Sequence, residues 1–238
     1  MKTPLTAIVL VGGLGTRLRA LYPDRPKALV PLNGRPFIAW MVDWLRHHGL
    51  RRIHLAAGHR AGQLEEWRRA QPADAHLTLA QETEPLGTGG GLRFAAASVP
   101  DETFLVVNGD SFLPGLDLRA WLADTRHSDT VAEIAVTRME RPGRYGTVEF
   151  DQDGRVHAFL EKVERPSGWV NGGLYWMHRD VLQRIPAQGA SSLEQDIFPA
   201  LAAEGCVTAH ATPAPLLDMG TPEGLTAMES FLRDHPLT

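Results

Sequence analysis

The first half of the chain alternates short apolar runs with segments in which apolar residues recur at helical spacing. Apolar runs of five or six residues that end at glycine or polar residues predict buried β-strands. Between them, large apolar side chains return every three or four residues, as Phe37, Trp40 and Trp44 do, which predicts helices. This alternation is typical of a parallel sheet with helices on both faces. The predicted strands are residues 6–11, 52–57, 77–81 and 103–108, and the predicted helices are residues 61–71, 92–97 and a segment from Pro36 to about Gly49.

The pattern changes after about residue 130. Residues 144–150 and 155–160 flank the turn Asp153-Gly154 and predict a hairpin, and residues 169–177 predict a further strand. We therefore expect an antiparallel insertion over about residues 137–177 that covers one edge of the parallel sheet. The remaining predicted elements are strands 130–137 and 207–211 and helices 117–127, 179–185, 193–203 and 222–232.

Composition narrows the class of protein. A chain of 238 residues is long enough to bury a core as one large domain. Its net charge of -4 argues against a general nucleic-acid binder, which carries a basic excess. The single cysteine, Cys206, excludes an intrachain disulfide framework, and no apolar run approaches the roughly 18 residues of a membrane span. These features predict a soluble, cytoplasmic protein without a nucleic-acid or membrane partner.

The loop after the first predicted strand combines glycines with cations. Gly12, Gly13 and Gly15 leave room for a ligand to approach the backbone, and successive amides of such a loop form an anion-binding nest. Arg17 and Lys27 add two charges that a triphosphate needs. The loop lacks the Gly-Lys-Ser/Thr of a P-loop and the third glycine of a dinucleotide fingerprint. Glycine spacing alone leaves two interpretations open: a nucleotide site, or a tight turn beside surface cations.

Two later segments support the nucleotide site. Residues 84–91 form a second glycine-rich turn, and Asn108-Gly109-Asp110 ends the strand predicted over residues 103–108. In open α/β sheets, ligands bind outside the carboxyl ends of the strands. Because all three loops follow predicted parallel strands, we expect them to converge at one sheet edge. A lone aspartate after Asn-Gly is more typical of a turn cap, so Asp110 gains meaning only from this company.

Six blocks in order resemble the signature of the sugar-1-phosphate nucleotidylyltransferases. The resemblance implies a Rossmann-like α/β fold with a mostly parallel central sheet, flanked by helices, and a small antiparallel sugar-binding insertion. It implies one domain over residues 1–238, with a nucleotide-binding part over about 1–136, a sugar-binding part over about 137–221 and a C-terminal helix over 222–238. The blocks are Gly12-Gly13-Leu14-Gly15-Thr16-Arg17 with Pro26-Lys27, Leu86-Gly87-Thr88-Gly89, Asn108-Gly109-Asp110, Glu161-Lys162, Asn171-Gly172-Gly173 and Asp218-Met219-Gly220-Thr221.

Within this family, the chain looks most like D-glycero-α-D-manno-heptose 1-phosphate guanylyltransferases. Four segments carry this resemblance: residues 144–148, 169–173, 192–196 and 218–223. That resemblance implies GTP and a heptose 1-phosphate as substrates, and GDP-heptose and pyrophosphate as products. N-acetylmuramate 1-phosphate uridylyltransferases and mannose 1-phosphate guanylyltransferases are the alternatives among enzymes. A nucleotide-sugar-sensing regulatory subunit is the alternative without catalysis. Two positions depart from many relatives: Leu216 stands where tryptophan is common, and Ala28 where proline is common.

The implied reaction is attack by a sugar-phosphate oxygen on the α-phosphorus of the triphosphate. The second pKa of a phosphate monoester is about 6, so this nucleophile is anionic at neutral pH and needs no general base. Positioning and charge stabilisation then supply most of the rate enhancement. The resemblance assigns catalysis to Arg17, Lys27 and Asp110, and an Mg²⁺ ion to Asp110 and Asp218.

The resemblance also assigns the binding residues. The residues expected to bind the nucleotide are Leu10, Gly12, Gly13, Gly15, Thr16, Arg17, Lys27, Gln81, Pro85, Gly87, Thr88 and Asp110. The residues expected to bind the sugar phosphate are Asn108, Tyr145, Gly146, Glu161, Lys162, Asn171 and Gly172.

Aromatic and histidine residues outside these blocks carry a simpler interpretation. Trp40, Trp44 and Trp67 recur at helical spacing and are interpreted as core packing, with the subunit contact of a homodimer as the alternative. The histidines are scattered and are interpreted as solvated or structural side chains.

Overall fold

We describe a computed structural model of the chain, covering residues 5–13, 15, 18, 20–124, 129–143, 145–160 and 165–235. Its central feature is a nine-stranded sheet. Seven strands follow the order β10-β9-β11-β6-β1-β4-β5, and β8 lies between β11 and β12. The strands are β1 (Thr6–Val11), β4 (Arg52–Ala57), β5 (Leu77–Gln81), β6 (Thr103–Asn108), β8 (Ala132–Glu140), β9 (Thr147–Phe150), β10 (Val156–Leu160), β11 (Ser167–His178) and β12 (Val207–Thr212).

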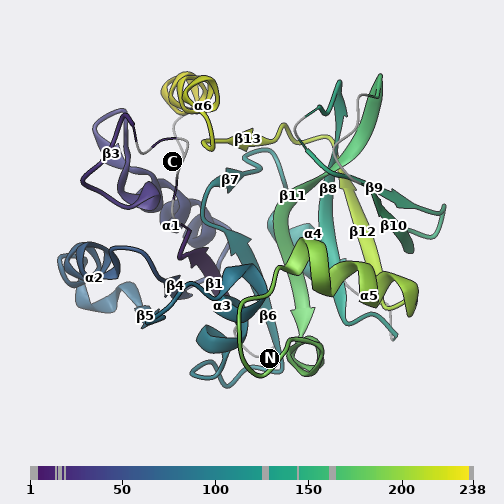
Figure 1. Cartoon of the computed structure of the whole chain (residues 1–238). Helices are drawn as coiled ribbons and strands as arrows, with labels where there is room; N and C mark the ends of the chain where they lie inside the picture. Colours follow the sequence, from purple (N-terminus) through teal and green to yellow (C-terminus); the bar gives the residue numbers. More distant parts are fainter. Residues whose placement is uncertain are drawn as a thin grey trace.

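Most strands of this sheet run in one direction. β1 pairs in parallel with β4 and β6, β4 pairs in parallel with β5, and β12 pairs in parallel with β8. β11 is antiparallel to both β6 and β8, and the β9–β10 hairpin joins the first part of β11. Figure 1 shows β6 and β11 side by side in the middle of the molecule. The predicted mostly parallel α/β sheet with an antiparallel insertion is confirmed.

Helices and short segments complete the described chain. The α-helices are α1 (Phe37–His47), α2 (Ala61–Arg69), α3 (Gly87–Ala96), α4 (Leu118–Asp124), α5 (Phe198–Ala203) and α6 (Pro222–Asp234). Short 3-10 turns cover η1 (Lys27–Leu29), η2 (Ala73–Ala75) and η3 (Arg179–Arg184), and η4 (Leu193–Ile197) is one π-helical turn. Four two-residue strands are β2 (Pro31–Leu32), β3 (Arg35–Pro36), β7 (Ser111–Phe112) and β13 (Leu217–Asp218).

The core lies on both faces of the sheet. Along β1, Ala7 and Val9 belong to one buried cluster, whereas Ile8 belongs to the other, as the two-residue period of a strand requires. The first cluster holds the apolar side chains of α1, and the second holds those of α3 and α5. Trp44 is 1% exposed and Trp67 packs against the first cluster, so their interpretation as core packing is confirmed.

Three predicted helices differ from the observed elements. α3 begins at Gly87 rather than Leu92, because its glycines allow contact with a distant loop. A Cβ at Gly87, whose φ is +71°, would collide with the carbonyl oxygen of Ser191. The helix predicted over 179–185 is a 3-10 turn, and the segment predicted over 193–203 is helical as an α-helix only from Phe198. Among the described residues, we find no helix with the length and apolar character that crossing a membrane requires.

Candidate active site

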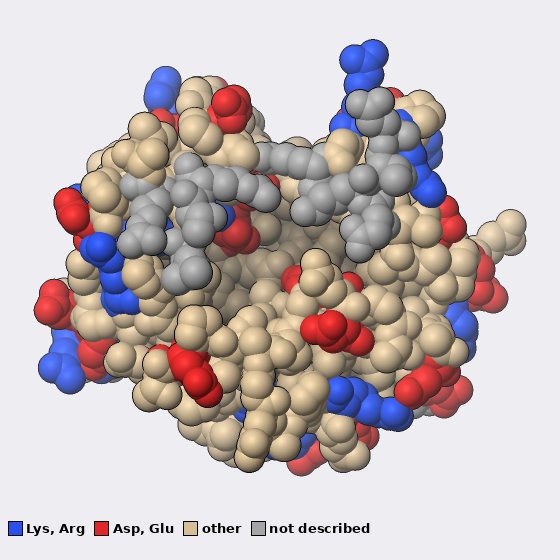
Figure 2. All heavy atoms as spheres, in the orientation of Figure 1, with Lys and Arg blue, Asp and Glu red and all other residues tan. Residues whose placement is uncertain are grey.

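A cavity of about 340 Å³ opens at the carboxyl ends of β1 and β6, where α3 begins. The face shown in Figure 2 is hollowed at its centre. The predicted convergence of the three loops is therefore confirmed for the described residues. The lining residues are Leu10, Val11, Gly12, Gly13, Lys27, Ala28, Ala56, Glu82, Pro85, Gly87, Thr88, Gly91, Asn108, Gly109 and Asp110.

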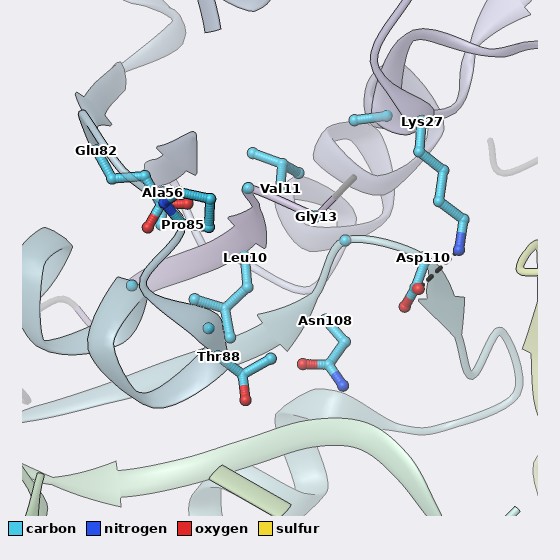
Figure 3. Close-up of a pocket in the computed structure, with 15 residues that line it drawn as sticks. Leu10, Val11, Gly13, Lys27, Ala56, Glu82, Pro85, Thr88, Asn108 and Asp110 are labelled. Atoms are coloured by element: carbon cyan, nitrogen blue, oxygen red, sulfur yellow. Dashed lines mark hydrogen bonds and ion pairs between the residues drawn. The ribbon is translucent and has the colours of Figure 1, made fainter. Parts of the chain in front are cut away.

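One end of the cavity carries an ion pair. Lys27 lies in the turn η1, directly after Pro26, and Asp110 follows β6. Lys27 Nζ lies 2.7 Å from Asp110 Oδ2, and the two side chains are 15% and 43% exposed. Figure 3 shows this pair at one end of the cavity, with Glu82 and Pro85 at the other. The geometry thus places a lysine ammonium at this end of the cavity, next to a carboxylate that still meets solvent.

The opposite end holds a carboxylate with no cation among its described neighbours. Glu82 follows β5, and its carboxylate lies close to the backbone of Gly12 and Gly58, where a Cβ on either glycine would collide with Oε1. Glu82 Oε2 is buried and has no hydrogen-bond partner. Burial raises the pKa of this carboxyl above its ordinary value of 4.5, although the backbone amide of Leu86 opposes the rise. An unsatisfied acceptor of this kind costs free energy unless a ligand supplies donors.

The two aspartates predicted to bind metal lie on neighbouring segments. β13 pairs with β7 so that Asp218 is opposite Ser111, and the backbone amide of Met219 donates to the carbonyl oxygen of Asp110 at 3.1 Å. The Tyr145 hydroxyl donates to Asp218 Oδ2 at 3.1 Å. The described residues contain no group of three or more His, Cys, Asp or Glu side chains that could hold a metal by themselves. Two carboxylates suit a hard cation that takes its other ligands from phosphate oxygens and water.

Two of the residues predicted to bind the sugar phosphate, Asn171 and Gly172, lie at an irregularity in β11 beside the end of β6. Asn171 lies opposite Val136, but Tyr175 lies opposite Ile134, so β11 has two extra residues between them. Gly173, with a φ of +75°, uses this irregularity to lie against Ser111 and Asn108. Local pairing therefore brings residues 171–173 of the insertion to the carboxyl end of a core strand.

A buried tyrosine connects the asparagines of this region. The Tyr175 hydroxyl accepts hydrogen bonds from Asn171 Nδ2 at 2.9 Å and Asn108 Nδ2 at 3.1 Å. It donates to Glu194 Oε1 at 3.2 Å. Burial, together with the negative charge of Glu194, raises the pKa of Tyr175 well above its ordinary value, so the hydroxyl stays protonated.

The structure does not bring every predicted site residue together. Gln81 is an exposed residue at the end of β5 and does not line the cavity, whereas its neighbour Glu82 does. Gly15 contacts the Lys27 side chain, and Gly146 and Gly172 lie in the insertion, with Gly172 buried against Leu113. The predicted site residues Thr16, Arg17, Glu161 and Lys162 lie outside the described residues.

Three polar residues were not predicted: Glu82, Tyr175 and Glu194. A charged residue after a strand, such as Glu82, is typical of an exposed turn. Tyr175 continues an apolar strand pattern, and Glu194 lies in a segment with helical spacing. Only the position of Glu194 in the block 192–196 set it apart in the sequence. The interpretation of histidines as structural is confirmed for His54, which is 4% exposed and contacts Thr78 and Ser98 hydroxyls.

Residues 6–235 match the nucleotidyl transferase family. The chain is 36% identical to a mannose-1-phosphate guanylyltransferase of Mycobacterium tuberculosis over 91% of its own length, and spans 61% of that relative. It is 31% identical to a D-glycero-alpha-D-manno-heptose 1-phosphate guanylyltransferase of Campylobacter jejuni, covering 92% of this chain and 96% of the relative. Among solved structures, HddC from Yersinia pseudotuberculosis superposes with a TM-score of 0.83 at 28% identity, covering 95% and 98% of the two chains, and it has also been solved with GMP-PN.

Proposed function

Because this chain belongs to the nucleotidyl transferase family, we propose that it transfers a guanylyl group from GTP to a sugar 1-phosphate. The sugar substrate we propose is D-glycero-α-D-manno-heptose 1-phosphate, and the products are GDP-heptose and pyrophosphate. The similarity to heptose guanylyltransferases, which extends over 96% of the Campylobacter jejuni relative, supports this choice. Mannose 1-phosphate is the second candidate sugar, supported by the similarity to mannose guanylyltransferases.

The carboxylate of Glu82, whose Oε2 has no hydrogen-bond partner, is the observation that best supports guanine as the base. A carboxylate only accepts hydrogen bonds, and its two oxygens match two adjacent donors. Guanine presents N1–H and N2–H₂ side by side on one edge. Uracil presents a single N–H between two carbonyl oxygens, which a carboxylate would repel. Glu82 therefore favours GTP over UTP, which speaks against N-acetylmuramate 1-phosphate uridylyl transfer.

The end of the cavity that carries Lys27 suits the triphosphate. With guanine at Glu82, the phosphates extend toward Lys27 and Asp110, at the opposite end in Figure 3. In this proposal, Lys27 neutralises charge at the α-phosphate as the sugar-phosphate oxygen attacks and pyrophosphate leaves. Arg17 holds the β- and γ-phosphates and Lys162 the incoming sugar phosphate, in the roles that the resemblance implies. The nucleophile is already anionic, so the site needs placement and charge rather than a base.

We propose Mg²⁺ as the divalent cation, held by Asp110 and Asp218. The pairing of β7 with β13, which brings the backbone of Asp218 and Met219 next to Ser111 and Asp110, supports this assignment. A bound Mg²⁺ would neutralise and orient the phosphate oxygens of both substrates. Tyr145 keeps Asp218 oriented by its hydrogen bond, and Lys27 does the same for Asp110.

We propose that the sugar binds beside β11. Asn108 and Asn171 share the Tyr175 hydroxyl, which supports a common polar surface for sugar hydroxyls. Gly146 and Gly172 would offer backbone groups, and Glu161 a carboxylate. The chain would act as one domain, since β8 crosses the boundary near residue 136 and pairs on both sides of it. A cytoplasmic location and a homodimer remain predictions.

A pyrophosphate-release assay tests the function. Purified protein is incubated with each of the four NTPs and with heptose, mannose or N-acetylmuramate 1-phosphate in the presence of Mg²⁺. We expect turnover with GTP and heptose 1-phosphate, and its loss in Asp110→Asn, which we expect to fold normally. A preference for UTP would overturn the assignment of guanine. Binding of GDP-heptose without turnover of any pair would instead favour the regulatory subunit.

A further inference from the structure

The carboxylate of Glu194 is bonded to residues from both halves of the proposed site. Its Oε2 accepts from the Thr88 hydroxyl at 2.8 Å, and Thr88 lines the nucleotide cavity. Its Oε1 accepts from the Tyr175 hydroxyl at 3.2 Å and from Asn108 Nδ2 at 3.4 Å. Tyr175 in turn contacts Asn171 of β11. One side chain thus connects the start of α3, the end of β6 and the insertion.

The local sequence holds Glu194 at this junction. It lies in the π-helical turn η4, and such turns are frequent at functional sites. Leu193 and Ile197 anchor the turn in the core, at 0% and 3% exposure. The backbone amide of Leu193 donates to the Thr88 hydroxyl at 2.8 Å, which directs the hydroxyl hydrogen of Thr88 to Glu194. The Ser192 hydroxyl accepts from the Gln195 amide and donates to Glu194 Oε2 at 3.0 Å.

The charge of Glu194 sets the direction of the whole hydrogen-bond chain. A carboxylate has no hydrogen to donate, so the Tyr175 hydroxyl must donate to it. The two lone pairs of that hydroxyl then face Asn108 and Asn171, which must turn their NH₂ groups toward Tyr175. As a result, Asn108 Oδ1 has no hydrogen-bond partner, and Asn171 Oδ1 accepts from the Gly173 amide at 2.8 Å. The orientation of the Asn108 amide is therefore set from a third segment of the chain, whereas Asn171 is held both by this chain of hydrogen bonds and by the Gly173 amide.

We propose that Glu194 is a positioning residue that couples nucleotide binding to sugar 1-phosphate binding. A ligand that moves the Thr88 side chain also moves the Glu194 carboxylate, to which the Tyr175 hydroxyl donates. Movement of Tyr175 then displaces Asn108 and Asn171. A ligand on the asparagines acts on Thr88 by the same route. Such coupling is reciprocal and is commonly about 5- to 150-fold in affinity. The inference rests on the proposed function, because it assigns Thr88 to the nucleotide and Asn171 to the sugar phosphate.

The substitution Glu194→Gln changes the hydrogen-bonding character of this side chain and keeps its size and shape. Glutamine fills the same space but can donate, so the Tyr175 hydroxyl can reverse and the Asn108 amide loses its set direction. Asp196→Asn is the matched control, because Asp196 lies in the same turn and its carboxylate accepts from the Ser192 amide at 2.7 Å rather than from Thr88 or Tyr175. Tyr175→Phe removes only the hydroxyl, while the ring keeps its packing against Phe198.

The test is the affinity of the full chain for α,β-methylene-GTP, a non-reacting analogue, by calorimetry with and without saturating heptose 1-phosphate. In the wild type we expect the two dissociation constants to differ at least fivefold. In Glu194→Gln and Tyr175→Phe the ratio should fall to within about twofold of one, and in Asp196→Asn it should stay at the wild-type value. Circular dichroism melting shows whether each variant is folded.

The outcomes separate this inference from the function on which it rests. Wild-type protein that binds both ligands independently, or Glu194→Gln protein that keeps the wild-type ratio, would overturn the coupling and leave the proposed function standing. An equal loss of coupling in Asp196→Asn would show that the turn as a whole, not the Glu194 charge, is responsible. If the wild type binds neither ligand, the proposed function fails, and the coupling fails with it.

Discussion

Two acidic side chains at opposite ends of the same sheet have opposite surroundings. Asp101 precedes β6, is 7% exposed in its side chain, and accepts hydrogen bonds from the Thr6 amide, the Thr6 hydroxyl and Arg52. Glu82 follows β5 and has a buried oxygen without a partner. Burial raises the pKa of both groups, but the hydrogen bonds of Arg52 and Thr6 outweigh burial at Asp101 and hold its pKa below 3.8.

The difference shows that buried polar groups have different roles at the two ends of the sheet. At the amino end, the carboxylate is satisfied within the protein, so it contributes to folding. At the carboxyl end, the carboxylate costs stability in the free protein and becomes useful when a ligand donates to it. Substitutions at the carboxyl end of the strands are therefore expected to change function and leave stability unchanged. Substitutions at the amino end are expected to change stability and leave function unchanged.

The largest effect on function is expected for Lys27→Met. Removing one charge-stabilising group commonly lowers kcat by about 10²–10³-fold. The pair with Asp110 is partly exposed, so we expect the free energy of unfolding to change by no more than about 1 kcal/mol. Steady-state kinetics and urea denaturation measure the two effects. A wild-type kcat in this variant would show that Lys27 has no role in catalysis.

The largest effect on stability is expected for Asp101→Asn. Hydrogen bonds to a charged group contribute about 1.5–3 kcal/mol, and we expect a loss at the lower end because Arg52 is 35% exposed and can turn to water. Urea denaturation measures this loss, and GTP affinity should stay within twofold of the wild type. A variant that loses GTP affinity without losing stability would contradict the comparison.

Glu82→Gln should change base preference more than stability. Losing the match to two guanine donors is expected to weaken GTP binding by about 1–3 kcal/mol, the usual discrimination of a bidentate contact. The free energy of unfolding should hold or rise, since the buried charge is removed. Calorimetry with GTP, ATP and UTP measures the preference. Equal losses for all three nucleotides would mean that Glu82 does not contact the base.

The same pair predicts opposite responses to acid. The pKa of Asp101 is depressed on folding, so its contribution to stability is complete above pH 3.8 and is lost as the pH falls through its folded pKa. The pKa of Glu82 is raised, so its stability cost is relieved as the pH falls through a folded pKa above 4.5, while GTP binding weakens there. GTP titrations of wild type and Glu82→Gln from pH 8 down to pH 4.5 test this, because only the wild type should lose affinity through Glu82.

The smallest effect is expected at a surface pair that lies at neither edge. Arg184 and Glu204 approach to 2.8 Å but are 51% and 41% exposed. Exposed pairs contribute about 0–1 kcal/mol, so Glu204→Gln should change neither the urea midpoint nor the kinetics measurably. It serves as the baseline for the other variants.

The sequence predicted the parallel half of the sheet well, since residues 6–11, 52–57, 77–81 and 103–108 are the strands observed. Apolar strands buried on both faces are specified by their own composition. The start of α3 was missed because glycine disfavours helices, and the reason for Gly87 is its contact with Ser191, about a hundred residues later.

The site was predicted where a chain segment carries its own pattern, as at Gly12, Lys27 and Asp110. Site residues were missed where the role of a side chain depends on contacts with residues distant in the sequence. Glu82 becomes distinctive only because Gly12 and Gly58 lie against its carboxylate. Glu194 becomes distinctive only because Thr88 and Tyr175 meet it. No local pattern in the sequence contains these pairs.

The position of β1 between β4 and β6 has a consequence for biosynthesis. One side of β1 pairs with β4, which begins at Arg52, and the other side pairs with β6, which contains Phe104. As the chain leaves the ribosome, that edge stays unpaired until β6 has emerged. The walls of the cavity therefore assemble late, and the proposed substrate GTP would stabilise only a nascent chain that already extends past Asp110.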